Sequence, residues 1–354
     1  MAKVKNYSRT IGVFFNQATE ARSSNNSLIV PELVSMGFNV VVVSINPDGL
    51  WKVSEMSPDV SGSGKIEKND SQKNYDWSLH LNSKGVLQLS RPTTLSRQFI
   101  DIDIVMPAFS DDLALQQSII SVAEAMRVQY IGPSASVLAL LSDAVLAYDV
   151  MKTYDVPIVP FVFFSAEEWS AHEKAFAREV INEVGFPARI QAFVGSQVVL
   201  SDIITNRDVL ETSVTNSLKN SERLIITPAD TGNFAVKVFV MGNYTRPHQI
   251  QVAVNVVGGV ITASRKQSTL SASLSSRLEK IAKQAFLGLE GAGMLEFDVI
   301  INSAGTILFR NVSACPDNYA MSVWADCDIT PEQLFRELVR LSDENNQSIK
   351  SNGK

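Results

Sequence analysis

The chain has few of the features that mark secreted, membrane or nucleic-acid-binding proteins. Its 354 residues include two cysteines, which cannot build a disulfide framework. No apolar run approaches the ~18 residues that cross a bilayer; the longest runs, at 11–15 and 40–43, are strand-sized. Lys3 and Lys5 precede no apolar segment, so we expect no secretory signal. We therefore expect a cytoplasmic location and no membrane partner.

Positive charge is also sparse. The formal net charge is −6, and the lysines and arginines are scattered along the sequence. A nucleic-acid-binding protein normally gathers them on one face, so we expect no nucleic-acid partner. With 45% hydrophobic and 19% charged residues, the composition is that of an ordinary globular protein. Its length suffices for roughly two or three domains of ~150 residues each.

The first expected loop contains no glycine. A strand is predicted at 10–15, a polar loop at 16–26, a helix ending near Met36, and a second strand at 39–44. This order is typical of a nucleotide-binding fold. A phosphate-binding loop, however, needs glycine for close approach of the backbone. We therefore expect this loop not to bind phosphate.

Short β-branched runs alternate with helical segments along the whole chain, which predicts an α/β protein. The polar segment 54–75 predicts a flexible insertion, and Ser165 with Glu168 has the spacing of a helix capping box. The other expected helices are at 113–126, 136–154, 270–289 and from Thr330 onward. The other expected strands are at 103–107, 129–132, 161–164, 188–193, 197–201, 223–227, 235–241 and 249–257, with hairpins at 77–89 and 294–312.

Four stretches follow one another in a recognisable order: SINPDGLWKV (44–53), YIGPSASVLALLSDAVLAYDVMKTYDVPIVPFVFF (130–164), FPARIQAFVGS (186–196), and 294–341 with its MSVW string. As an ordered set, which spans roughly residues 8–342, they resemble the D-alanine–D-alanine ligase family of the ATP-grasp superfamily. The resemblance implies an α/β ATP-grasp fold. It implies a Rossmann-like domain at 1–135, a central subdomain at 136–230, a C-terminal subdomain at 231–345, and a flexible tail at 346–354.

Such a ligase joins a carboxylate to an amine through an acyl phosphate, so it needs cations for ATP and oxygen ligands for Mg²⁺. Where the family has its two ATP lysines, this chain has Ala144 and Gln191. A glutamine donates a hydrogen bond but does not offset anionic charge. The matched phosphate loop retains Gly195 and Ser196. The family's adenine and ribose carboxylates match the apolar string LIIT (224–227), and the lid loop carries the cations Arg265 and Lys266.

The resemblance places the metal ligands on the last hairpin, at Asp298, Asn311 and Ser313. Glu296 replaces the family's arginine and shares a strand face with Asp298. A two-residue turn at 304–305 would set Asp298 opposite Asn311 and Glu296 opposite Ser313. Two arrangements are open: the two carboxylates rebuild a divalent site, or they meet nearby lysines or water.

These losses predict a homologue of D-alanine–D-alanine ligase with a degraded ATP and metal site. We expect it to be catalytically impaired and to act by binding a small ligand or an enzyme of the bacterial cell wall. The resemblance also implies a homodimer through the N-terminal domain, with helix 113–126 supplying surface. The alternative is an active ligase with a rebuilt site, and only then would ATP and Mg²⁺ be its cofactors. That site would use the following residues: Glu296, Asp298, Gln191, Arg265 and Lys266.

Overall fold

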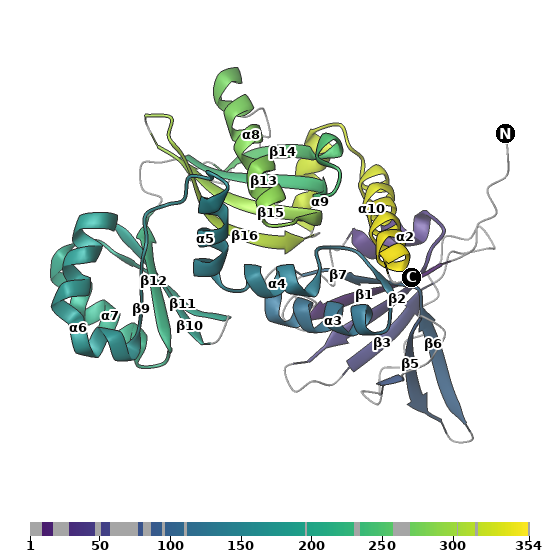
Figure 1. Ribbon diagram of the computed structural model, residues 1–354. Coiled ribbons are helices and arrows are strands. Elements are labelled where there is room, and N and C mark those ends of the chain that lie inside the picture. The colour runs from purple at the N-terminus through teal and green to yellow at the C-terminus, as the bar shows by residue number, and fades with distance from the viewer. Residues whose placement is uncertain are drawn as a thin grey trace.

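The computed structural model describes residues 9–16, 28–46, 51–56, 77–80, 86–93, 96–109, 112–194, 197–229, 234–257, 270–302, 304–315 and 318–352. In this part of the chain the strands form three main sheets, here called the N-terminal, central and C-terminal sheets (Figure 1). Helices cover them, and the α/β class expected from the sequence is confirmed. Within the described residues, no helix is long and apolar enough to cross a membrane.

The N-terminal sheet has the order β3-β2-β1-β7-β8. Its strands are β1 (Thr10–Asn16), β2 (Asn39–Ile45), β3 (Trp51–Met56), β7 (Ile104–Pro107) and β8 (Gln129–Tyr130). All neighbours except β2 and β3 are parallel. Parallel strands are buried on both faces, which explains the continuous apolar run in β1. The covering helices are α2 (Ile29–Ser35) and α3 (Leu113–Ala125).

A small antiparallel sheet of β4 (Ser78–His80), β5 (Leu87–Pro92) and β6 (Arg97–Ile102) projects beside the N-terminal sheet (Figure 1). β4 and β5 confirm the expected hairpin, while its turn lies outside the described residues. The polar segment expected at 54–75 begins inside β3, and the rest of it also lies outside the described part.

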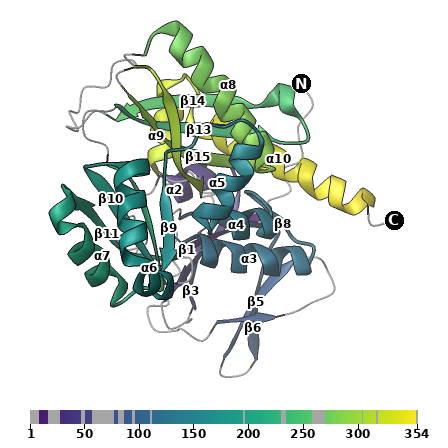
Figure 2. The same cartoon turned by 60° about the vertical axis from the view of Figure 1, so that its left-hand side comes forward.

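The central sheet has the order β11-β10-β12-β9 and is antiparallel throughout. Its strands are β9 (Val162–Ser165), β10 (Ala188–Val194), β11 (Gln197–Ile204) and β12 (Arg223–Pro228). Helices α6 (Ala166–Glu179) and α7 (Leu210–Leu218) lie together on one face of it (Figure 2). The predicted capping box at Ser165 and Glu168 is present at the start of α6.

The C-terminal sheet has the order β14-β13-β15-β16. Its strands are β13 (Phe234–Asn243), β14 (Gln251–Val257), β15 (Ala292–Ile301) and β16 (Ile307–Cys315), and its helices are α8 (Ala272–Gly288), α9 (Asn318–Asp326) and α10 (Pro331–Asn352). Trp324 of α9 and Phe335 of α10 lie in one apolar cluster with Ile11 and Met106 of the N-terminal sheet. The two ends of the chain therefore share a core.

The structure corrects two expected helices. The helix expected at 136–154 is divided into α4 (Ala135–Leu141) and α5 (Ala144–Thr153), because the Asp143 carboxylate accepts hydrogen bonds from the amides of Val145 and Leu146 and starts a new helix. The last helix continues to Asn352, through most of the tail expected to be flexible. The sequence reasoning also missed β6, α7 and α9.

Candidate functional site

The hairpin of β15 and β16 has the predicted pairing at the expected metal ligands. Asp298 lies opposite Asn311 and Glu296 opposite Ser313. The two-residue turn expected at 304–305 is wrong. That turn would pair Ile301 with Leu308, whereas Ile301 pairs with Ile307. A bulge at Arg310 offsets that shift by one residue. The register is therefore confirmed, although its cause is a bulge and not a two-residue turn.

Lys237 connects the two carboxylates of this hairpin. It lies on β13 directly opposite Asp298 of β15, so the two side chains share a face of the sheet. The Lys237 ammonium donates to Asp298 Oδ1 at 2.8 Å and also to Glu296 Oε1. The Glu296 side chain is only 7% exposed and that of Lys237 is 32% exposed. A partly buried cation thus contacts both acids.

The protonation of Lys237 follows from these contacts. Burial by itself would lower the pKa of the Lys237 ammonium, since it disfavours the charged form. The charge of Asp298 and the hydrogen bonds to both carboxylates outweigh burial and raise that pKa above its ordinary value. Lys237 is therefore a permanent cation at physiological pH, and of the two arrangements considered for the carboxylates, the structure has the one with a lysine.

The other two expected metal ligands, Asn311 and Ser313, are more exposed to solvent than Glu296. Asn311 is exposed and Ser313 is half-buried. Within the described part of the chain, no three histidine, cysteine, aspartate or glutamate side chains are gathered as a metal site requires. The assignment of Asp298, Asn311, Ser313 and Glu296 to a metal stays a prediction.

The start of α5 faces the central sheet through an ion pair. Arg223 of β12 donates to Asp143 Oδ2 at 2.8 Å, and its guanidinium lies over the rings of Phe163 and Phe193. Burial would raise the pKa of the Asp143 carboxyl, but Arg223 and the helix amides hold it below its ordinary value. Ala144, which was expected to stand in place of the family's first lysine, is the first residue of this helix.

Gln191 lies on β10, half-buried, between Ser201 of β11 and Ile225 of β12. Strand alternation puts Arg189 and Phe193 on the same face. The carboxamide of Gln191 makes no hydrogen bond with another described residue. Arg189 Nη1 donates to Ser201 Oγ at 3.4 Å, and this face therefore carries an arginine two positions before Gln191.

The other proposed cofactor contacts, Gly195, Ser196, Arg265 and Lys266, lie outside the described residues. Sequence reasoning missed Arg189 and Arg223. The two-residue period of β10 was a signal for Arg189, whereas nothing local in the sequence points Arg223 at Asp143.

Tyr148 joins α5 to the C-terminal hairpin. Its hydroxyl donates to the backbone carbonyl of Arg310, the bulged residue of β16. Burial raises the pKa of Tyr148 above its ordinary range, so the hydroxyl stays a donor. Since Asp143 of the same helix holds Arg223, α5 connects the central sheet to the hairpin (Figure 2).

Comparison with known proteins identifies the family of this chain. The sequence model of the family described as D-ala D-ala ligase C-terminus matches residues 150–340. The D-alanine–D-alanine ligase of Lactococcus lactis subsp. cremoris strain MG1363 is 25% identical over 260 residues, covering 68% of this chain and 72% of the relative. That of Heliobacterium modesticaldum is 22% identical over 340 residues, covering 88% of each.

Solved structures show the same fold. The D-alanine–D-alanine ligase from Coxiella burnetii superposes with a TM-score of 0.73 at 16% identity, covering 97% of this chain and 96% of that one. The ligase from Bacillus anthracis complexed with ATP has a TM-score of 0.65 at 12% identity, with 96% and 99% covered. The likeness confirms the α/β ATP-grasp fold.

Proposed function

Because this chain belongs to the D-alanine–D-alanine ligase family, we propose that it is a homologue with an impaired ATP and metal site, which acts by binding rather than by ligation. One observation carries the proposal. The Lys237 ammonium lies between Asp298 and Glu296, where a divalent cation held by both carboxylates would have to bind. The cation implied by the family and the residues present do not fit each other.

Electrostatics makes Lys237 hard to displace. Removing one partner from a fully buried ion pair costs ~3–5 kcal/mol, and the cost here is smaller because the Lys237 side chain is partly exposed. A divalent ion would in addition face the ammonium as a like charge. Mg²⁺ loses its water reluctantly and favours carboxylates, so these acids offer it little while Lys237 is present.

The phosphate side supports the same proposal. Ala144 and Gln191 supply no positive charge, and the first amides of α5 already donate to the Asp143 carboxylate. A helix N-terminus attracts anions through such amides, and here an internal anion takes them. On the central sheet, Ile225 beside Gln191 is buried.

We propose that the partner bound by this protein is either a small molecule or an enzyme of the cell wall.

One observation favours the alternative of an active ligase with a rebuilt site. Arg189 and Arg223 lie on the same face as Gln191 and could take the role of the missing lysines toward phosphate. ATP and Mg²⁺ would then be the cofactors. This alternative must also explain a metal site that contains Lys237.

The deciding experiment compares the parent protein with Lys237→Gln and Lys237→Arg. We expect no Mn²⁺ binding by titration calorimetry in the parent or in Lys237→Arg, which keeps the cation. Lys237→Gln should bind Mn²⁺, because it leaves Asp298 and Glu296 without their shared ammonium.

The same preparations are tested for ATP. A ligand at ~100 times its Kd raises the free energy of unfolding by ~2.7 kcal/mol, so binding of millimolar ATP-Mg²⁺ would be visible as a higher melting temperature. We expect no rise and no ADP release with D-alanine in the parent. ADP release that depends on D-alanine and is lost in Asp298→Asn would establish the active ligase instead.

A further inference from the structure

The central sheet has one long edge strand. Its two outer strands are β9, with four residues, and β11, with eight. In the described part of the chain, no strand pairs with β11 on the side away from β10. The N–H and C=O groups on the open side of such a strand can pair with a further strand. β11 is therefore the edge of this sheet that offers the longer backbone for strand addition.

The side chains of this edge are exposed and largely apolar. All of residues 199–203 are exposed, and the exposed fractions of Val199, Leu200 and Ile203 are 50%, 41% and 45%. Single exposed apolar side chains are ordinary on a protein surface. Three of them within five residues of one strand form a contiguous patch, and such patches mark interaction sites.

This edge lacks the usual protections against strand addition. Proteins shield exposed edges with lysine, proline, bulges or very short strands. β11 has the sequence QVVLSDII, which contains no lysine and no proline. Its bulge lies near its start, opposite the step from Ala192 to Phe193 of β10, and pairing with β10 is regular from Leu200 to Ile204. The patch therefore lies mainly on the regular part of the strand.

Asp202 is the charged residue of this edge, and the fold gives it no cation. Its carboxylate accepts the amide of Ile203 at 2.8 Å and makes no ion pair with any residue that the structure describes. Asp202 lies opposite Ile190 of β10, whereas Arg189 lies opposite Ile203. Neighbouring positions of a strand point to opposite faces, so the arginine of β10 is on the other face of the sheet.

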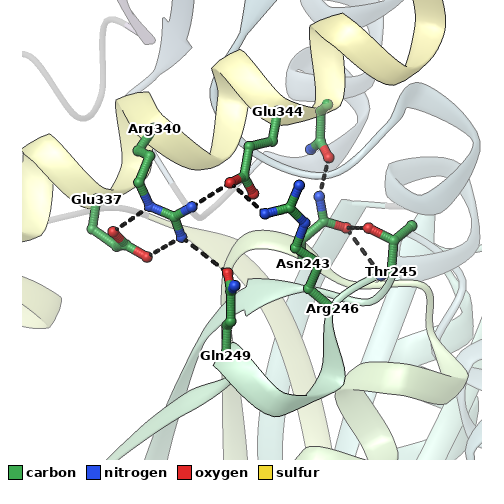
Figure 3. A network of polar contacts seen from close by, with 8 residues as sticks. Asn243, Thr245, Arg246, Gln249, Glu337, Arg340 and Glu344 are labelled. Carbon is green, nitrogen blue, oxygen red and sulfur yellow. Dashed lines mark hydrogen bonds and ion pairs between the residues drawn. The ribbon is translucent and has the colours of Figure 1, made fainter. Parts of the chain in front are cut away.

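The acids of α10 show the contrasting arrangement, in which the chain supplies the cations itself. Arg340 pairs with Glu337 and Glu344, and Arg246 from the turn after β13 also pairs with Glu344 (Figure 3). At Asp202, a cation has to come from a partner.

We propose that β11 binds an extended segment of a partner protein, which adds to the central sheet as a further strand and places a lysine or arginine opposite Asp202. In this mode of recognition, main-chain hydrogen bonds give affinity and alternate side chains give specificity. An antiparallel segment that matches Ile203, Asp202, Ser201 and Leu200 in turn reads apolar, basic, any residue, apolar. The inference goes beyond the proposed function and does not depend on it, since it uses neither Lys237 nor the hairpin.

A second copy of this chain fits the edge less well. Two copies of β11 related by a two-fold axis would pair antiparallel, each presenting the same strand to the other. Because β11 contains no lysine or arginine, every such register leaves Asp202 opposite a neutral or an acidic residue. Charge complementarity therefore favours a segment of a different protein.

The test uses the full chain and a fluorescein-labelled peptide, Thr-Val-Lys-Thr-Val-Thr, in fluorescence anisotropy. A second peptide has glutamate in place of the lysine. We expect the parent to bind the lysine peptide about threefold more tightly than the glutamate peptide, because opposite charges across a strand pair attract and like charges repel. A lysine peptide N-methylated on both valines should not bind, because it has lost main-chain donors of the added strand.

Variants of the protein locate the bound peptide. Asp202→Lys should reverse the preference between the two peptides, and Asp202→Asn should remove it. The matched control is Asp208→Lys, which makes the same charge change at an exposed residue of the 3-10 turn Arg207–Val209, outside β11. It should leave the preference unchanged in roughly 0.15 M salt, where exposed charges more than about 8 Å apart are largely screened.

Several results would overturn the proposal. They are that the parent binds neither peptide, that it binds both equally, that N-methylation leaves binding intact, or that Asp202→Lys keeps the order of the parent. An equal effect of Asp208→Lys would show a general response to charge and would also overturn it. Light scattering covers the other occupant: a mass above that of the chain that Ile203→Lys lowers would place a second copy on β11 instead. Asp202 is exposed, and Asp202→Asn decides the matter if Asp202→Lys does not fold.

Discussion

At the scale of single residues, charges that are far apart in sequence determine the character of the site. Lys237 and Asp298 are separated by 61 positions, and Arg223 and Asp143 by 80. In each pair, a positively charged side chain that could have faced a ligand forms an ion pair with a carboxylate of the same chain. Helix α5 contacts the central sheet through its N-cap residue Asp143 and the hairpin through Tyr148.

Asp143 has two roles that two substitutions separate. Asparagine is also a good N-cap, so Asp143→Asn should remove only the charge and cost about 1 kcal/mol of unfolding free energy. Asp143→Ala removes the cap as well and should cost about 1 kcal/mol more. Urea unfolding at neutral pH measures both differences.

The cost of Asp143→Asn should depend on pH. The pKa of the folded carboxyl lies below its ordinary 3.8, so the stabilisation is present above that value and is lost as pH falls through the lowered pKa. The parent and Asp143→Asn should therefore have the same free energy of unfolding under strongly acid conditions. A difference that stays constant from neutral to strongly acid pH would contradict the ion pair with Arg223.

At the scale of elements, the hairpin shows how local features combine into a register. The turn between Asn302 and Thr306 and the bulge at Arg310 shift the pairing in opposite senses. As a result Asn311 lies opposite Asp298. The turn alone would not place Asn311 opposite Asp298.

This register can be tested by restoring a carboxylate. We expect Asn311→Glu, made together with Lys237→Gln, to bind Mn²⁺ more tightly than Lys237→Gln alone, because oxygen sites bind divalent ions more tightly as ligand charge rises. Asn311→Gln in the same background matches the size without the charge and should add nothing. Equal Mn²⁺ affinities for all three proteins would show that residue 311 does not face Asp298.

At the scale of the whole molecule, α10 joins the two ends of the chain. Phe335 is fully buried in the cluster that contains Ile11, whereas the pair of Arg9 and Asp343 is 33% and 40% exposed. We expect Phe335→Ala to cost ~3–5 kcal/mol and Arg9→Ala ~0.2–1 kcal/mol. Urea unfolding measures both, and equal costs would mean that ion pairs rather than the shared core hold α10.

A homodimer through the N-terminal sheet stays a prediction. α3 buries Ile119, Ile120 and Ala123 within its own chain, which leaves half-buried leucine and valine side chains to supply apolar surface: Leu113, Leu115 and Val122. Light scattering at tens of micromolar should give twice the chain mass. A mass of 38.8 kDa would contradict the prediction.

Patterns within short stretches of the sequence predicted much of the secondary structure of this protein. β-branched runs predicted most strands of the three main sheets, and spacing predicted the capping box at Ser165. That Ala144 and Gln191 stand where the family has lysines is implied by the resemblance of short strings and stays a prediction. These signals are local, because helix and strand periods and caps are set by residues a few positions apart. The division at Asp143 was missed, although an aspartate is a common helix start.

Contacts between distant segments were decided only by the tertiary structure. Lys237 meets Glu296 because β13 pairs with β15, and Glu124 shares a pocket with Asn345 because α10 packs beside β8. A sequence pattern gives the face on which a side chain lies, but not which strand or helix will be its neighbour. Strand order and helix packing supply that neighbour, so the sequence could point to the two carboxylates of the hairpin, whereas the fold determined that a lysine lies between them.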